Sequence, residues 1–445
     1  MSPRFVCVLL VAPLLAQPSS EFVTKADQYI QSYVQAGRFT GSVLLAKGGT
    51  VVYSKGFGMA NLELDVPNKP ETKFRLGSIT KQFTAAAILQ LQERGLLNVK
   101  DEISKYVPDS PESWKGITIH QLLTHTSGIP SYTNGPEYVK HMREEATPLE
   151  FIKRFRDKPL DFKPGERFSY DNSGYFLLGV IIEQVSKMKY EEYLRNNIFD
   201  KADMVDTGYD HPESILKNRA TGYSKKGDKV INSEYLDMGQ PYAAGSLYST
   251  TLDLYRWDRA LYTAKILQSK SLDSAFTVNK AGYGYGWFIE MQHGHKTVGH
   301  GGGINGFSTV IRRAIEEDAV AILLSNSDSS NAVGMMGKEL LGLLLGEDIK
   351  PLVTRTEIPL DQKASERLTG KYQLGPIVLT VELANGKFFA QATGQPKLQL
   401  HRFSANGFFA QEVEAEITFA ESGTKAAELT LSQGGQKILA KRIPE

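Results

Sequence analysis

The stretch FRLGSITKQFTAAAIL, residues 74–89, predicts a largely buried helix that starts near Ser78. Lys81 follows Ser78 by three residues, so both lie on one helical face. An inward-facing lysine is costly unless it is paired or used. Burial would lower its pKa and let it take the serine proton, while the helix N-terminus would direct a free backbone N–H at an oxyanion. The alternative is that Ser78 only caps the helix.

The spacing Ser-x-x-Lys is not specific by itself, because it occurs four times in this chain. The other copies begin at Ser186, Ser214 and Ser422. The first two lie in polar segments at predicted helix ends, and the third lies in a predicted β-turn. We interpret these three as solvated surface and retain Ser78 with Lys81 as the candidate nucleophile and its activating partner.

A second candidate motif, YDN at residues 170–172, precedes an apolar helix predicted at Tyr175–Val185. A tyrosine near a lysine can relay a proton, so Tyr170 is a candidate relay. The amide of Asn172 can hold a substrate carbonyl. The same spacing recurs at Tyr132-Thr133-Asn134. The alternative is a helix N-cap formed by one residue of the segment: Asp171, Asn172 or Ser173.

A third candidate motif is His300-Gly301-Gly302-Gly303. Three glycines beside a histidine leave the backbone bare, so that a substrate can pair with it as an added strand. The alternative is a plain glycine turn with a solvated histidine.

The order of the predicted elements gives the fold class. Glu21–Ala36 has the apolar spacing of a helix, and two β-rich runs around Lys47–Thr50 predict a hairpin. Residues 78–275 are mostly helical in pattern. Three strands and a last helix follow, at 285–291, 310–313, 319–325 and 331–345. Strands first and last predict an α/β (α+β) fold, in which an antiparallel sheet packs against a separate helical lobe and leaves a crevice for substrate.

The C-terminal residues have a different sequence pattern from the rest of the chain. Short strands and hairpin turns such as Asn385-Gly386 and Asn406-Gly407 predict a small all-β sandwich or barrel. The predicted strands are 378–383, 388–392, 408–413, 417–419 and 427–431. We place the domains at residues 21–346 and 366–445, joined by a polar linker at 347–365.

The first residues predict an export signal at 1–17. Arg4 precedes a short apolar run, Phe5–Ala16, that falls short of the roughly 20 residues of a membrane-spanning helix. The alternative is a buried N-terminal strand. Cys7, the one cysteine, lies inside the signal, so the exported chain would hold no disulfide or thiol nucleophile. We expect a secreted or periplasmic protein with no stable membrane insertion after cleavage.

Composition and motif searches exclude several classes of protein. The 445 residues carry a net charge of +1 with dispersed basic residues, which argues against a nucleic-acid partner. The sequence contains no Gly-x-Ser-x-Gly elbow, no histidine spacing suited to zinc and no dinucleotide-binding fingerprint. We expect no metal and no cofactor.

Taken in order, Ser78-x-x-Lys81, Tyr170-x-Asn172 and His300-x-Gly302 resemble the motifs of the serine β-lactamase and penicillin-binding-protein family. The likeness is to the branch of class C β-lactamases, D,D-carboxypeptidases, D-aminopeptidases and family esterases, and it covers roughly Glu21 to Leu345. Three further segments look like that family: Leu122–Gly128, Ala244–Ser249 and Gly284–Trp287.

The resemblance implies a role for each candidate. The catalytic residues would be Ser78 as nucleophile, Lys81 as activating partner, Tyr170 as proton relay and His300 on the strand beside the site. The substrate-binding residues would be Asn172, Gly302 and Gly303, with an oxyanion hole from the backbone N–H groups of Ser78 and Gly303. Whether lysine or tyrosine is the kinetic base stays open. The C-terminal region resembles the small lipocalin-like β-barrel appended to many family members.

One departure from the family pattern bears on the substrate. Class C β-lactamases generally carry Lys-Thr-Gly where this chain has His300-Gly301-Gly302. This sequence looks more like the peptidase and esterase members, which favours D-amino-acid-containing peptides over small esters, and esters over β-lactams. The non-hydrolytic alternative is a penicillin-binding sensor of peptidoglycan. The sequence leaves the oligomeric state open.

Overall fold

The computed structural model describes residues 20–444 apart from 228, 330–331, 354, 411–412, 414, 421–424 and 434–435. The predicted signal at 1–17, Cys7 and Ser422 lie outside the described residues. The chain divides into two compact units, Met1–Pro351 and Leu352–Glu445. The second unit therefore begins inside the predicted linker, 347–365.

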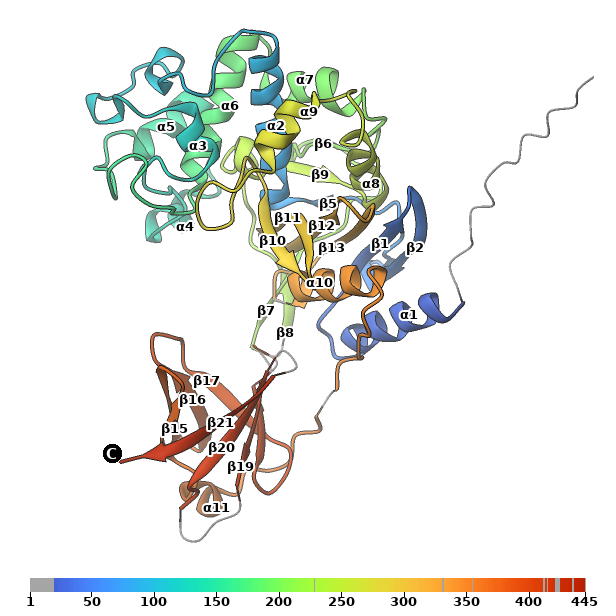
Figure 1. Ribbon diagram of the computed structural model, residues 1–445, viewed down its shortest axis with the longest axis vertical. Coiled ribbons are helices and arrows are strands. Elements are labelled where there is room, and N and C mark those ends of the chain that lie inside the picture. Colours follow the sequence, from blue (N-terminus) through green and yellow to red (C-terminus); the bar gives the residue numbers. More distant parts are fainter. Residues whose placement is uncertain are drawn as a thin grey trace, which may run out of the picture. The chain divides into compact units, whose positions relative to one another are not determined.

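A six-stranded antiparallel sheet forms the centre of the first unit, in the order β10-β11-β12-β13-β1-β2 (Figure 1). The strands are β1 (Gly41–Lys47), β2 (Thr50–Phe57), β10 (Phe288–Gln292), β11 (His295–Ile304), β12 (Phe307–Ala314) and β13 (Ala319–Ser325). All of β13 is buried, and it pairs with β1 from Gly41↔Ser325 to Lys47↔Ala319. The beginning and the end of this unit thus build one sheet, as the sequence predicted.

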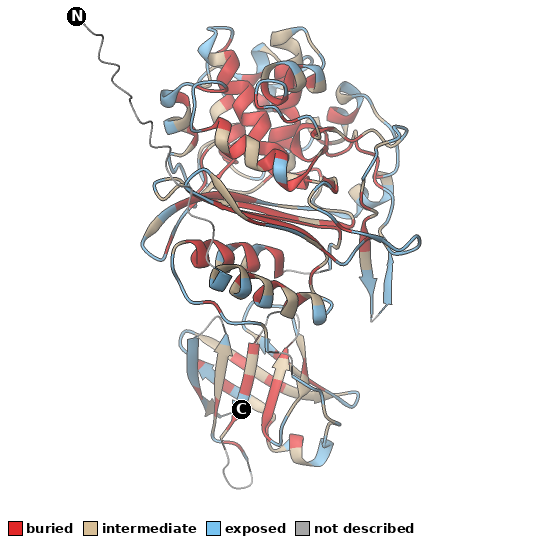
Figure 2. Cartoon of the chain, turned by 90° about the vertical axis from the view of Figure 1, so that its right-hand side faces the viewer, coloured by how far each residue is buried: buried red, intermediate tan, exposed pale blue. Residues whose placement is uncertain are grey.

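Helices cover both faces of this sheet, so its strands lie as a buried layer between them (Figure 2). On one face lie α1 (Ser20–Gln35) and α10 (Ala332–Leu344). The helical lobe covers the other. Its helices are α2 (Thr80–Glu93), α3 (Ile119–Leu123), α4 (Pro136–His141), α5 (Pro148–Arg156), α6 (Asn172–Ser186), α7 (Tyr190–Leu194), α8 (Thr251–Ala260) and α9 (Ser269–Ala275).

The prediction that residues 78–275 are mostly helical is wrong in part. The segment also contains the hairpin β7–β8 and the strands β6 and β9, and β9 joins β6 to β5 in a small sheet. The bounds are β5 (Phe74–Arg75), β6 (Gly208–Tyr209), β7 (Tyr223–Lys226), β8 (Lys229–Asn232) and β9 (Leu247–Ser249), with a further hairpin of β3 (Met59–Asn61) and β4 (Val66–Pro67). Strands of two to four residues are too short to show a period-2 pattern.

The second unit is a closed eight-stranded barrel in which each strand pairs with the next along the chain, and β14 pairs with β21 to close it. The strands are β14 (Gly370–Leu374), β15 (Ile377–Ala384), β16 (Lys387–Ala392), β17 (Leu398–Arg402), β18 (Gly407–Ala410), β19 (Ala415–Phe419), β20 (Glu428–Gln433) and β21 (Gln436–Ile443), after a short helix α11 (Gln362–Glu366). Phe388, Phe408 and Phe419 pack together inside. The sequence located five of these strands and missed β14, β17 and β21.

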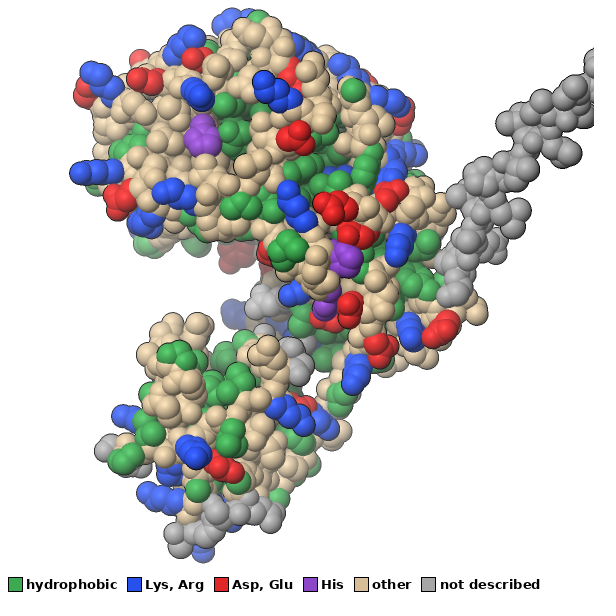
Figure 3. Space-filling model, in the orientation of Figure 1, with side chains coloured by type: hydrophobic (Ala, Val, Ile, Leu, Met, Phe, Trp, Pro, Cys, Tyr) green, Lys and Arg blue, Asp and Glu red, His purple; other side chains and the backbone are tan. Residues whose placement is uncertain are grey.

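Positive and negative side chains are interspersed over the face of the first unit seen in Figure 3. Among the described residues, the helices are all too short or too polar to cross a membrane.

The two cores predict separate unfolding transitions. Phe388 is fully buried in the barrel, so Phe388→Ala should lower the stability of that unit by about 3–5 kcal/mol. Scanning calorimetry should show the barrel transition moving down while the transition of the first unit stays in place. Leu439→Ala is the matched control, because Leu439 is 53% exposed and its loss should cost about 0.5 kcal/mol or less. A shift of both transitions in Phe388→Ala would contradict independent cores.

Candidate active site

Ser78 lies half-buried in a 3-10 turn, Gly77–Ile79, that leads directly into α2. The side chain of Ser78 does not cap this turn, and α2 begins without a side-chain cap. The alternative of a purely structural N-cap therefore fails for Ser78. Its hydroxyl group instead lies 3.0 Å from the Nζ of Lys81, one helical turn further on.

Lys81 is fully buried on a helix that is buried all round from Thr80 to Leu91. Its Nζ lies 2.8 Å from Asn172 Oδ1 and 2.9 Å from the carbonyl oxygen of Ala244. The Nζ also lies 5.0 Å from the ring centroid of Tyr170. Burial lowers the pKa of Lys81 to about 7, although the nearby Asp171 carboxylate acts in the opposite direction. The amine therefore changes charge near neutral pH.

The three polar partners of Lys81 suit both of its protonation states. Asn172 Oδ1 and the Ala244 carbonyl oxygen can only accept, so they take two N–H bonds in either state. The third position faces Ser78. An ammonium group donates there, whereas a neutral amine presents its lone pair and accepts the Ser78 O–H. The geometry aims the basic lone pair at the serine hydroxyl.

Tyr170 lies on the loop before α6, and Ser78 lies close enough to its hydroxyl group to influence its pKa. Burial raises the pKa of Tyr170 far above neutrality, although Ser78 acts in the opposite direction. The side chain is therefore a neutral phenol that can donate and accept a proton at once. Asp171 caps α6 through Gly174 N–H, so the predicted N-cap and the predicted site occupy adjacent residues.

Asn172 is fixed at both ends of its amide. While Oδ1 accepts from Lys81, Nδ2 donates to the Thr133 hydroxyl group over 3.0 Å. The Asn172 N–H donates to Ser131 Oγ over 3.1 Å. The second Tyr-x-Asn sequence, Tyr132-Thr133-Asn134, thus contributes Thr133 as a partner of Asn172. Its tyrosine, Tyr132, is 7% exposed and packs among aromatic rings.

His300 lies on β11 and is buried, with both ring nitrogens occupied. Its Nδ1 lies 2.6 Å from the Gly301 carbonyl oxygen, which can only accept, so Nδ1 carries the proton. Its Nε2, 3.1 Å away, then accepts from the Tyr283 hydroxyl group. Burial lowers the pKa of His300 to about 3, and the charge of Lys81 acts in the same direction. His300 is therefore neutral across the physiological range.

Two glycines allow β11 to approach the serine turn. A Cβ on Gly302 would lie 1.9 Å from the carbonyl oxygen of Leu76, which is impossible without moving the backbone. Gly77 has φ +54°, and a Cβ there would lie 3.0 Å from the backbone N of Gly303. The backbones of Gly303 and the serine turn therefore meet edge to edge.

Comparison with known proteins gives the family of this chain. Residues 26–345 match the sequence profile of the β-lactamase family. The chain belongs to the β-lactamase family. It is similar to a penicillin-binding protein of Bacillus subtilis (strain 168), at 31% identity over 424 residues that cover 87% of this chain and 92% of that protein.

Solved structures of the β-lactamase family share the fold. The octameric penicillin-binding protein homologue from Pyrococcus abyssi has a TM-score of 0.69 at 29% identity and covers 94% of this chain and 99% of its own. A D-stereospecific amidohydrolase from Streptomyces sp. has a TM-score of 0.62 at 25% identity and covers 73% of this chain and 99% of its own. The family includes hydrolases, and its fold carries the antiparallel sheet and helical lobe described above.

The seven sequence-predicted site residues come from neighbouring parts of the fold: the serine turn (Ser78), the first turn of α2 (Lys81), the loop before α6 (Tyr170), the start of α6 (Asn172) and β11 (His300, Gly302 and Gly303). Sequence reasoning missed four groups that hold them: the Ala244 carbonyl, Thr133, Tyr283 and His125. A backbone carbonyl leaves no sequence signal. Of the side chains, only His125 stood in a segment that looked like the family.

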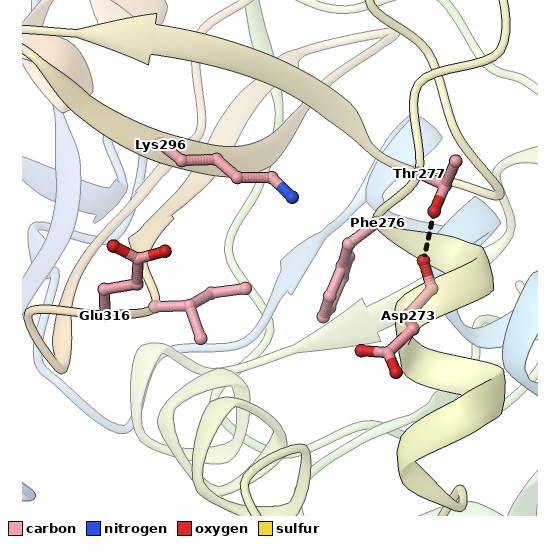
Figure 4. A pocket seen from close by; sticks show the side chains of 6 residues that line it. Asp273, Phe276, Thr277, Lys296 and Glu316 are labelled. Atoms are coloured by element: carbon pink, nitrogen blue, oxygen red, sulfur yellow. Dashed lines mark hydrogen bonds between the residues drawn. The ribbon is translucent and has the colours of Figure 1, made fainter.

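Two other hollows of the first unit contain none of these residues. One of about 330 Å³ lies between α9 and β11, where Lys296 points toward Phe276 and Thr277 donates to the Asp273 carbonyl oxygen over 2.6 Å (Figure 4). The other, of about 490 Å³, is lined by residues of 191–216 and by Tyr248. The candidate site is distinct from both.

The contact at Gly302 predicts a paired result for two alanine substitutions in β11. Gly302→Ala should disrupt the site and lower the melting temperature, because its Cβ would overlap the Leu76 carbonyl oxygen. Gly301→Ala is the matched control, since its Cβ would meet Thr309 O at an ordinary 3.6 Å. Thermal unfolding of both purified variants checks this, and equal losses would contradict the close approach of β11 to the serine turn.

Proposed function

We propose that this chain is a serine acyl-hydrolase that forms an acyl-enzyme on Ser78. The observation that carries the proposal is the buried Lys81 amine, whose third hydrogen-bond position faces Ser78 Oγ at 3.0 Å. A binding protein needs no nucleophile beside an amine whose pKa burial lowers to about 7.

In the proposed acylation, neutral Lys81 accepts the Ser78 proton as Oγ bonds to the substrate carbonyl carbon. The backbone N–H groups of Ser78 and Gly303 would stabilise the oxyanion. Tyr170, which lies beside Ser78 and Lys81, donates its proton to the leaving amine or alcohol and regains one from the Lys81 ammonium. The carbonyl–leaving-group bond breaks, and water reverses the sequence to release the acid.

The proposed substrates are D-amino-acid-containing peptides. The glycine-rich part of β11, Gly301 to Gly303, runs beside Ser78 beyond the last residue that pairs with β10, Gly299. This edge can pair with an extended peptide. His300 is neutral, so it brings no cation to a substrate carboxylate. The names of two structural neighbours, D-amino acid amidase from Ochrobactrum anthropi SV3 and the Streptomyces D-stereospecific amidohydrolase, support amide chemistry on substrates of D configuration.

Two related activities remain as alternatives of the same site, a carboxylesterase and a β-lactamase. A penicillin-binding sensor that acylates without turnover is the non-hydrolytic alternative, and the name of the Bacillus subtilis relative supports it. We also propose export, on the basis of the signal pattern at residues 1–17.

Burst kinetics test the proposal. A D-alanyl anilide, p-nitrophenyl acetate and nitrocefin should be compared on the wild type and Ser78→Ala. We expect a burst followed by turnover, best on the anilide, that Ser78→Ala abolishes. Ser186→Ala and Ser214→Ala are matched controls from the other Ser-x-x-Lys copies, because Ser186 only accepts from Met188 N–H and Ser214 is exposed. Full activity in Ser78→Ala would refute the nucleophile, and a burst without turnover would favour the sensor.

The pH dependence should identify the base. Lys81 must lose its proton to act, so the rate of Ser78 labelling by a fluorophosphonate should rise with pH, with a midpoint of about 7 set by the pKa of Lys81. Lys81→Ala should slow labelling at least about 100-fold and remove this limb. His300→Gln should keep the midpoint, because the pKa of His300 is about 3. If the rise of the labelling rate with pH disappeared in His300→Gln, the assignment of this titration to Lys81 would be wrong.

A further inference from the structure

His125 holds the backbone on both sides of Tyr170. It lies on the loop after α3, fully buried, with a left-handed backbone at φ +54°. Its carbonyl oxygen accepts from Ser169 N–H over 2.9 Å, and its Nδ1 accepts from Asp171 N–H over 3.2 Å. The rings of His125 and Tyr170 are 4.3 Å apart. The left-handed backbone conformation of His125 is uncommon for a non-glycine residue, and it is kept because the surrounding contacts fix it.

The Asp171 carboxylate is held in the same place. Asp171 is 4% exposed, and Gly174 N–H donates to its Oδ1 over 2.5 Å. The next residue, Asn172, accepts from Lys81 over 2.8 Å. A buried carboxylate is thus fixed one residue away from the group that holds the lysine.

The other titratable groups around Lys81 are neutral. Burial raises the pKa of three tyrosines and lowers the pKa of two histidines in this part of the site: Tyr170, Tyr175, Tyr283, His125 and His300. Among these neighbours in the described part of the chain, only Asp171 acts on Lys81 as an opposite charge.

We infer that Asp171, held in place by His125, is a positioning residue that provides the counter-charge for the Lys81 ammonium formed when Ser78 gives up its proton. The inference rests on the proposed acyl-hydrolase function. A buried carboxylate has the corresponding effect on the imidazolium of a Ser-His-Asp triad, which it stabilises without taking the proton. Here it acts through space on an amine that Asn172 holds.

The inference fixes the sign of a measurable change. Without the carboxylate, the buried ammonium loses its favourable partner, so Lys81 should release its proton at lower pH. The pH midpoint of labelling should then move to a lower value. The limiting rate at high pH should fall, because a weaker base accepts the serine proton less readily.

Asp171→Asn is the decisive variant, because asparagine caps a helix as well as aspartate does and removes only the charge. Glu112→Gln is the matched charge control, since the Glu112 side chain is 86% exposed. The pH midpoint of fluorophosphonate labelling should be measured on both, together with the melting temperature. Carbon-13 NMR of labelled lysine Cε, assigned by its absence in Lys81→Met, follows the same proton without using activity.

A lower midpoint in Asp171→Asn, with Glu112→Gln at the wild-type value, supports the inference. An unchanged midpoint by labelling and NMR in a folded Asp171→Asn overturns it and leaves the acyl-enzyme proposal intact. If wild-type Ser78 is not labelled at any pH, the proposed function itself fails, and the NMR titration still decides whether Asp171 acts on Lys81. Asp171→Ser, which also caps a helix, replaces the asparagine variant if that variant does not fold.

Discussion

The structure of the first unit depends on one buried amine. An ammonium group without water needs hydrogen-bond acceptors on every side, and Lys81 has three of them. They come from separate parts of the chain: the serine turn, the start of α6 and the segment before β9. These parts must be assembled before the lysine is satisfied. The hydrogen bonds that position Lys81 in the candidate site are therefore also contacts that hold the first unit together.

The surroundings of this amine explain why its protonation is adjustable. Aromatic rings and neutral imidazoles exclude water without supplying charge, which lowers the pKa of Lys81 to about 7. The Asp171 carboxylate limits that effect. His300, which stands where class C β-lactamases generally carry lysine, adds no second cation. This difference in charge supports the proposed preference for D-amino-acid-containing peptides over β-lactams.

The sheet brings backbone N–H groups close to the serine turn. Gly302 lets β11 pass beside the Leu76 carbonyl oxygen, and Gly77 turns the backbone so that Ser78 faces the edge of β11 near Gly303. Contact distance requires glycine at position 302, and the positive φ favours glycine at position 77. Backbone N–H groups placed in this way do not have to reorganise when charge develops.

The sequence by itself determined the parts of this protein that are local. Periodicity gave α1, α2, α6, α10 and the sheet at both ends of the first unit, because each of these elements is long enough to show its pattern. Motif order and the family resemblance named Ser78, Lys81, Tyr170, Asn172 and His300. Only the tertiary structure decided that Ser78 does not cap a helix and that His300 is neutral. It also decided that the Ala244 carbonyl oxygen accepts from Lys81, that the Thr133 hydroxyl group accepts from Asn172, and that His125 Nδ1 accepts from Asp171 N–H. Burial, contacts with backbone carbonyls and through-space charge join residues that are far apart in the sequence. Lys81 and Ala244, for example, lie 163 positions apart, so the pattern around any single residue does not contain such contacts.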